Sequence, residues 1–432
     1  MAMVVKNNMS AISTLNTLNK NSSALSKSLQ KVSSGMKING AADDASGYAI
    51  SERMRVQIRG LDQANQNTQN GSSMMKVAEG AVSSTVDILK TLKEKVINAA
   101  NDTNTDADRQ TIQKELDQSI DQINDNANVT YNGKYLVDGS HNSHVEATTT
   151  SMTNQSLNTG STFDSTFTAL TDRNGNSLNI QTSDTITLSY VKEGKTHTVT
   201  ATGASTITSI LTAGTAANDL KAGEATSVIG KDIAGDTVFT ADGKSGLTIT
   251  AAGTGIENQI SGITFSVTDT KGNVKKSANA LLDNFSESIR AQNPSNDNSI
   301  NLQVGTKSNQ AIKVGLTDMR AEALGLQAKD GTTLNISTKE YANAAINVLD
   351  SAVQKALDQQ TTIGAVQSRL EYTSSNLTTA SENVQSSEST IRDADMAKEM
   401  TNYTKNNVLM QAAQAMLSQA NQSSSSVLSL LQ

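Results

Sequence analysis

Between Ala342 and Ile391 the chain repeats one spacing that limits its possible folds more than any other feature. Mostly apolar residues recur at alternating steps of three and four along this stretch. A mean spacing near 3.5 residues keeps one face of an α-helix turned toward a partner along its whole length, as in a coiled coil. The helix would be roughly 75 Å long at about 1.5 Å per residue, so its partner must also be long. The seam contains Leu349, Ile363, Val366, Leu370, Leu377, Val384 and Ile391.

A second long helix is predicted from about Ala45 to Ala100, with the same spacing. Several of its seam positions are polar, Asn65 and Glu79 among them, so we expect looser packing there than in a dimeric zipper. A bundle of unequal helices fits this pattern better, and residues 105–128 are predicted to add a third helix. The apolar seam positions of the second helix are Met54, Ile58, Leu61, Met75, Val82, Val86 and Leu89.

Both ends of the chain are predicted to form helices with narrow apolar stripes, one over residues 9–36 and one after Ile391. With so few large apolar residues, such helices are hard to keep folded in an isolated chain. Either the two ends simply pair with each other, or they also need neighbouring copies and fold on assembly. The apolar tip at 427–431 favours assembly. The stripes contain Leu15, Leu18, Leu25, Leu29, Val32, Met400, Leu409, Met416, Leu417, Leu428 and Leu431.

Residues 141–299 differ in character, because Thr, Ser and Gly dominate and apolar residues alternate with polar ones. This alternation indicates half-buried β-strands joined by Gly-containing turns. We interpret the section as one inserted β-rich domain, with partial disorder at 140–174 as an alternative because apolar residues are sparse there. Strands are expected at 185–191, 196–200, 247–250 and 263–267, and short helices at 205–211 and 277–290.

Two hairpins are expected to flank the insert, one around Asn132-Gly133 and one over 300–316. The predicted fold class is therefore mainly α: a long antiparallel helical bundle or coiled coil formed by both chain ends, with an inserted β-rich domain. Three domains are predicted. The terminal helical domain comprises 1–40 and 393–432, the long-helix bundle comprises 41–140 and 300–392, and the surface-exposed insert comprises 141–299.

Composition and motifs argue against catalysis, nucleic-acid binding and membrane insertion. The net charge is −7 and Lys and Arg form no block, so a footprint for nucleic acid is missing. No apolar stretch approaches the ~18 residues of a membrane span, and the N-terminus lacks the features of a cleaved signal peptide. His141, His144 and Glu146 stand in a Ser- and Thr-rich loop without the helical spacing of a zinc site. We therefore expect no enzyme activity, no cofactor and no metal.

Short motifs at both ends resemble one family. Residues 32–39 read Val-Ser-Ser-Gly-Met-Lys-Ile-Asn, and Ala-Asp-Asp-Ala-Ser-Gly follows at 42–47. At the other end, Ile-Arg-Asp-Ala-Asp-Met-Ala occupies 391–397, followed by Tyr-Thr-Lys-Asn at 403–406 and Gln-Ala-Asn-Gln at 419–422. These motifs resemble the N- and C-terminal signatures of bacterial flagellins, and they occur in the same order. The insert 141–299 resembles no family that we can name.

The resemblance implies a structural subunit of the flagellar filament, a homopolymer of many copies used for motility. It implies secretion through the flagellar type III apparatus to an extracellular location, with terminal helices that line the filament channel. The implied partners are further copies, a filament cap, junction proteins and an export chaperone. Two alternatives remain at this point: a hook-filament junction protein, and a filament subunit whose insert is adhesive.

The resemblance also implies a weakened contact for an innate-immune receptor. Where the family pattern has Gln-Arg-Val-Arg-Glu-Leu, residues 90–95 read Lys-Thr-Leu-Lys-Glu-Lys. Thr91 stands where an arginine would anchor the receptor, and Lys95 stands where an apolar contact is expected. Leu92 stands where the pattern has valine, Glu94 is identical to the pattern, and Glu115 matches a family contact residue. Weak recognition by Toll-like receptor 5 is therefore expected.

Overall fold

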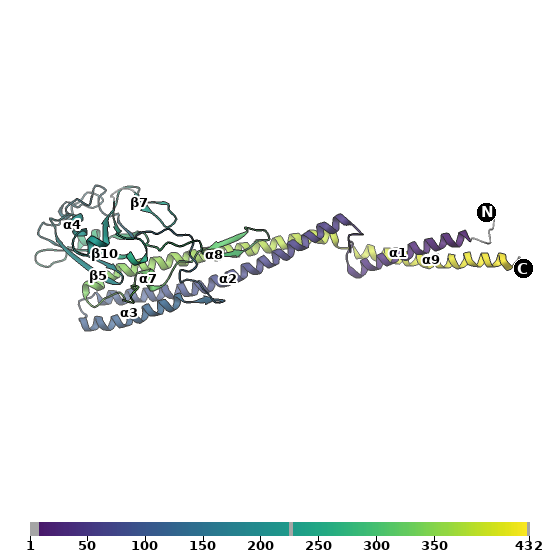
Figure 1. Ribbon diagram of the computed structural model, residues 1–432, viewed down its shortest axis with the longest axis horizontal. Coiled ribbons are helices and arrows are strands. Elements are labelled where there is room, and N and C mark those ends of the chain that lie inside the picture. Colours follow the sequence, from purple (N-terminus) through teal and green to yellow (C-terminus); the bar gives the residue numbers. More distant parts are fainter. Residues whose placement is uncertain (1–7, 224–227, 430–432) are drawn as a thin grey trace. The chain divides into compact units, whose positions relative to one another are not determined.

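The computed structural model describes residues 8–223 and 228–429 (Figure 1). Both ends of the chain are helical and the middle is rich in strands, which confirms the predicted fold class. The helices are α1 (Met9–Ser34), α2 (Ala45–Ala99), α3 (Asp106–Ala127), α4 (Ile207–Leu211), α5 (Ala216–Asp219), α6 (Lys276–Leu282), α7 (Ala321–Leu324), α8 (Lys339–Arg392) and α9 (Met396–Ser429), with 3-10 turns η1 (Phe167–Ala169) and η2 (Ile256–Asn258).

Local sequence signals set the helix ends. Gly35 ends α1 with φ +73°, a left-handed conformation that glycine adopts without the steric cost of a side chain. Thr105 and Asp108 form a reciprocal capping box at the start of α3. The predicted hairpin after α3 is confirmed, with β1 (Thr130–Tyr131) and β2 (Lys134–Tyr135) joined through Asn132 (φ +51°) and Gly133 (φ +76°).

The chain divides into two compact units, and α2 and α8 each contribute residues to both. The first unit contains residues up to Thr68, Gln303–Gln310 and residues from Tyr372 onward. The second contains Gln69–Leu302 and Ala311–Glu371.

In the first unit, α1 lies beside α9, and the start of α2 lies beside the end of α8 (Figure 1). Leu61, Ala64 and Leu377 form a small buried cluster between α2 and α8. The polar seam position Asn65 accepts a hydrogen bond from Ser374 Oγ at 2.7 Å. Polar seam residues are therefore paired across the two helices, and their hydrogen bonds offset part of the cost of burying them.

In the second unit, the remainder of α2 packs against both α3 and α8. Gln367 of α8 donates to Glu79 of α2 at 2.8 Å, and Lys95 of α2 pairs with Glu115 of α3 at 3.0 Å. Because α2 has two neighbours here, it buries two stripes of side chains. The stripes include Met74, Met75, Ala78, Val82, Val86, Leu89, Leu92, Val96 and Ala99.

The insert is built on two antiparallel sheets, one with the strand order β10-β4-β5 and one with the order β11-β3-β9-β6. Their inner faces and the short helices enclose one hydrophobic cluster, in which Phe265 packs against Phe167 and Phe285. The strands are β3 (Ser151–Asn154), β4 (Thr185–Lys192), β5 (Lys195–Thr202), β6 (Leu220–Ala222), β7 (Val228–Lys231), β8 (Thr237–Phe239), β9 (Leu247–Ala251), β10 (Ile260–Thr268) and β11 (Phe285–Ile289). The second flanking hairpin, β12 (Ile300–Gln303) with β13 (Ala311–Val314), is confirmed.

One expectation for the insert is wrong, and the alternative of partial disorder at 140–174 is contradicted. The helix expected at 277–290 ends at Leu282, and its second half is strand β11, which pairs with β3. Residues 140–174 are folded, because β3 is the partner of both β9 and β11 and is buried at every position. The hydroxyl groups of Thr153 and Thr248 form a hydrogen bond at 3.0 Å, and Asn154 donates to Leu281 O at 2.8 Å. These buried polar side chains therefore have hydrogen-bond partners.

Asp283, after α6, gives the insert a predictable pH dependence. Burial raises its pKa from 3.8 to about 6, and its hydrogen bond from Phe265 N only partly opposes this. The pKa of Asp283 is higher in the folded protein than in the unfolded chain. Its protonated form therefore contributes fully to folding stability below pH 3.8, and this contribution is lost as the pH rises to about 6. Asp283→Asn keeps an acceptor oxygen and removes the charge, so it should be more stable than wild type at pH 7 and nearly equal at pH 4. Thermal unfolding at both pH values tests this, and an equal difference at the two would contradict it.

Candidate assembly surface

The pairing of α1 with α9 buries small and polar residues rather than large apolar ones. Ser28 (6 % exposed) and Ala413 (7 %) are the buried residues of these two helices within their described part. Asn406 donates to Ser28 Oγ at 3.0 Å, and Asn21 donates to the Leu409 carbonyl at 3.1 Å. Small side chains and amide hydrogen bonds therefore hold the two helices together in antiparallel register.

The large apolar side chains of α1 and α9 remain exposed in a single chain. Met9 is 69 % exposed, Met416 63 % and Val408 58 %. Water contact of so many apolar side chains on two neighbouring helices is unfavourable, so contacts with other molecules that cover them would be stabilising. We call this set the assembly surface. It consists of Met9, Ile12, Leu15, Leu29, Met396, Met400, Val408, Leu409 and Met416.

The predicted stripe residues fall into three groups. Leu15, Leu29, Met400, Leu409 and Met416 are on the assembly surface, whereas Leu18, Leu25, Val32 and Leu417 are half-buried. Leu428 is in α9 but its side chain is outside the description, and Leu431 lies outside the described residues.

A polar junction fixes the end of α8 to the start of α2. The buried guanidinium of Arg392 pairs with Glu52 at 2.7 Å and lies 5.5 Å from the centre of the Tyr48 ring. The hydrogen bond from Arg392 lowers the pKa of Glu52. Lys37 N also donates to the Arg392 carbonyl at 2.6 Å, so the segment after α1 and the segment before α9 are joined. The spacing pattern gave no signal for this junction because Arg392 is charged.

The bundle seam residues are mostly inside, and their burial decreases along α8. Leu349, Ile363 and Leu370 are fully buried, Leu377 is 9 % exposed, and Val366, Val384 and Ile391 are half-buried. Ser387, which the spacing also places on the seam, is exposed while Arg392 is buried. A 3.5-residue repeat drifts around a helix of 3.6 residues per turn. This drift accounts for the change in which face of α8 is buried near its end. On α2, Leu61, Met75, Val82, Val86 and Leu89 are buried, and Met54 and Ile58 are half-buried.

Comparison with known proteins identifies the family. The bacterial flagellin N-terminal helical region matches residues 5–142, and the bacterial flagellin C-terminal helical region matches 346–431. A flagellin of Clostridium tyrobutyricum is 35 % identical, covering 97 % of this chain and 99 % of that protein. The chain belongs to the bacterial flagellin family. A flagellin of Bacillus subtilis (strain 168) is 30 % identical, covering 99 % of this chain and all of that protein.

A solved structure of the flagellar hook-associated protein-3 of Legionella pneumophila is also similar. It covers 78 % of this chain and 97 % of its own, with 15 % identity and a TM-score of 0.33. At this level of similarity, the family assignment rests on the flagellin regions and relatives.

Within this flagellin, the receptor-like residues do not form one exposed patch. Thr91, Glu94 and Glu115 are exposed, but Leu92 is only 1 % exposed and lies in the bundle core. Lys95 forms an ion pair with Glu115, so the carboxylate that matches the family contact residue already has a partner within the chain. Leu92 is therefore not available to a partner in the folded bundle.

Two further findings concern other functions. Among residues 8–223 and 228–429, no group of three or more His, Asp or Glu side chains is placed to hold a metal ion. Over the same residues, no helix is both long enough and apolar enough to cross a membrane.

Proposed function

We propose that this flagellin is a structural subunit that polymerises into the bacterial flagellar filament. One observation carries the proposal. Where α1 and α9 pack together they bury the small residues Ser28 of α1 and Ala413 of α9, and a set of large apolar side chains on both helices stays exposed. Contacts with further copies would remove that surface from water, at roughly 25 cal/mol for each Å² buried. Full-length relatives named flagellin do not favour the alternative of a hook-filament junction protein.

The finer arrangement is a further part of the proposal. Residues 1–40 and 393–432 would form the filament core around the channel, 41–140 and 300–392 the surrounding shell, and 141–299 the outer surface. Export would use the flagellar type III route and would not require a cleaved signal peptide. A chaperone would bind the C-terminal helix before export. In the assembled flagellum the chain would contact junction proteins and a cap. Its place is then outside the cell.

The proposal is tested by seeded polymerisation of the purified full-length chain. Short filament fragments are added to monomer, and the product is examined by sedimentation and electron microscopy. Long helical filaments are the expected result, because head-to-tail contacts that do not close give open polymers. Absence of seeded growth over a wide range of protein concentration would contradict the proposed function.

Weak signalling through Toll-like receptor 5 is a separate prediction. The expected potency of the monomer in a reporter assay is low, because Thr91 lacks the guanidinium of an arginine and Glu115 is already paired with Lys95. Thr91→Arg is expected to raise potency severalfold, since an arginine can form bidentate hydrogen bonds. Thr378→Arg, at an exposed helical threonine of α8 outside the receptor-like residues, serves as the control for added charge. Full potency of the unaltered monomer would contradict the prediction.

A further inference from the structure

Strand β5 lies at the edge of the sheet β10-β4-β5, with β4 as its one neighbour in that sheet. The two strands pair regularly from Lys192 opposite Lys195 to Thr185 opposite Thr202. Because a two-residue turn joins them, Lys195 and every second residue after it bond to β4. The backbone groups of the residues in between point away from β4, toward the edge. These residues are Thr196, Thr198, Thr200 and Thr202.

The opposite edge of the same sheet, on β10, is closed by side chains. Phe265 N donates to Asp283 at 2.6 Å, and Val267 N donates to Asn279 at 2.8 Å. Asn347 of α8 donates to another carbonyl of β10 at 3.3 Å. These outward backbone groups therefore have partners within the chain, and β10 is protected from pairing with another strand.

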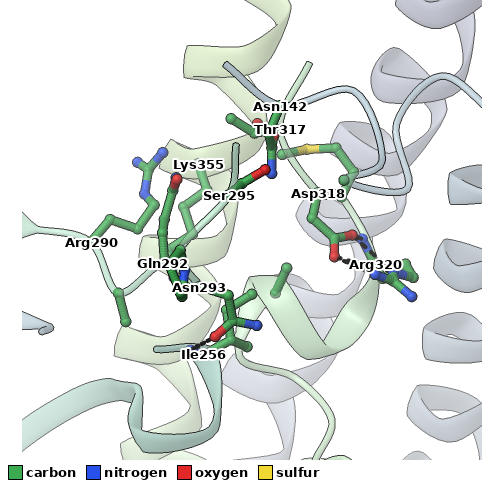
Figure 2. A pocket seen from close by; sticks show the side chains of 15 residues that line it. Asn142, Ile256, Arg290, Gln292, Asn293, Ser295, Thr317, Asp318, Arg320 and Lys355 are labelled. Carbon is green, nitrogen blue, oxygen red and sulfur yellow. Dashed lines mark hydrogen bonds and ion pairs between the residues drawn. The ribbon is translucent and has the colours of Figure 1, made fainter. Parts of the chain in front are cut away.

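The edges of the sheet β11-β3-β9-β6 are protected in other ways. β6 has only three residues, and Lys221 at its centre is exposed. β11 has an irregular register next to Glu287, which pairs with the buried Lys355 of α8 at 3.4 Å. Figure 2 shows Arg290, which follows β11, beside Lys355, and Arg290 also pairs with Asp358 of α8 at 2.9 Å. Short strands, irregular register and charges are common protections against the pairing of sheet edges.

The edge of β5 has none of these protections. Within residues 8–223 and 228–429, no hydrogen bond reaches the outward N–H and C=O groups of Thr196, Thr198 and Thr200. Thr198 and Thr200 are exposed, and the strand from Thr196 to Thr202 contains no Lys, Arg, Asp, Glu or Pro and no bulge. An open edge of this kind is a template for pairing with another strand.

We propose that β5 pairs in antiparallel register with β5 of a second copy of this chain, which joins two inserts through one continuous sheet. The pairing rests on the proposed function, because a homopolymer holds many copies at high effective concentration. A second β5 supplies the matching open edge, and threonine faces threonine when Thr198 lies opposite Thr200. In this register the two Lys195 side chains are roughly 27 Å apart, at about 3.4 Å per residue, so like charges stay separate.

Cysteine cross-linking of the full-length chain tests this pairing. The chain contains no cysteine, so each introduced thiol is unique. Equal amounts of Thr198→Cys and Thr200→Cys chains are polymerised together and oxidised. We expect up to about half of the chains in disulfide-linked dimers, because only mixed pairs place the two thiols opposite each other, with ~5.5 Å between the Cα atoms.

A mixture of Thr254→Cys and Thr270→Cys, at exposed threonines in two loops of the insert, is the control for random contact. It should form far fewer dimers, and equal dimer formation in the two mixtures would overturn the pairing. The free chain is oxidised in parallel at high concentration, so the measurement does not depend on filaments. Polymerisation without cross-links contradicts the pairing alone, and cross-links without polymerisation contradict the filament alone.

Amide hydrogen exchange gives a second readout. The amide protons of Thr198 and Thr200 should exchange at least tenfold more slowly in filaments than in the dilute free chain. Those of Phe265 and Val267 are the control, because they are bonded within one copy in both states. Unchanged exchange at Thr200 on assembly would overturn the pairing. Slower exchange without cross-linked dimers would overturn it as well, since another segment would then cover the edge.

Thr198→Pro removes one outward N–H and leaves the hydrogen bonds to β4 in place, because proline is tolerated at such positions of an edge strand. Filaments should still form, and the slowing of exchange at Thr200 should be lost. Full slowing in a folded Thr198→Pro protein would refute the pairing of β5 with a second copy.

Discussion

Met416→Glu should prevent filament formation at concentrations where the wild-type chain polymerises, while the monomer stays folded. Met416 is 63 % exposed on α9, so the glutamate meets water in the monomer and removes little packing. In a filament whose contacts cover the assembly surface, the carboxylate would be buried among apolar side chains. A cost of about 3 kcal/mol per subunit raises the concentration needed for growth roughly 100-fold.

Sedimentation and electron microscopy after seeding measure this effect, and circular dichroism of the monomer shows whether the helices are retained. Gln414→Glu is the matched control, because it places the same charge on the same helix at an exposed position that is already polar. It should reduce polymerisation much less. If Met416→Glu polymerises as readily as Gln414→Glu, the apolar character of this surface is not what drives assembly.

The sequence predicted the long helices well, because periodic spacing and local end signals agree. The predicted starts and ends of α1, α2 and α8 lie within a few residues of the observed ones. Gly35 ends a helix by its own conformational freedom, and Asn132-Gly133 makes a turn for the same reason. These are local effects, which a single sequence records directly.

What could not be predicted depends on contacts between segments distant in the chain. Strand β3 is not alternating, because both its faces are buried and its polar side chains bond to β9 and to Leu281 O. The family resemblance placed Leu92 in a receptor-like patch, but α2 has α3 and α8 on two sides and Leu92 is buried in the bundle. The α1–α9 contact through Ser28 and Asn406 gave no signal either, since serine and asparagine are frequent throughout these helices.

Leu349→Ala should cause one of the largest losses of monomer stability of any single truncation, about 2–5 kcal/mol. Leu349 is fully buried on α8, and the neighbouring seam position Ala352 is also fully buried, so the cavity left by the deleted carbon atoms cannot fill easily. Urea unfolding of the monomer measures the change through the midpoint and slope.

Leu357→Ala provides the comparison, because it removes the same atoms from the same helix at a position that is 38 % exposed. Its effect should be at most about 1 kcal/mol, since part of the side chain already contacts water. The two variants together distinguish burial at the seam from helix propensity, which changes equally in both. Similar losses of stability in the two variants would mean that the regular spacing along α8 does not mark its core. A loss of polymerisation in Leu357→Ala alone would place that leucine in contacts between subunits.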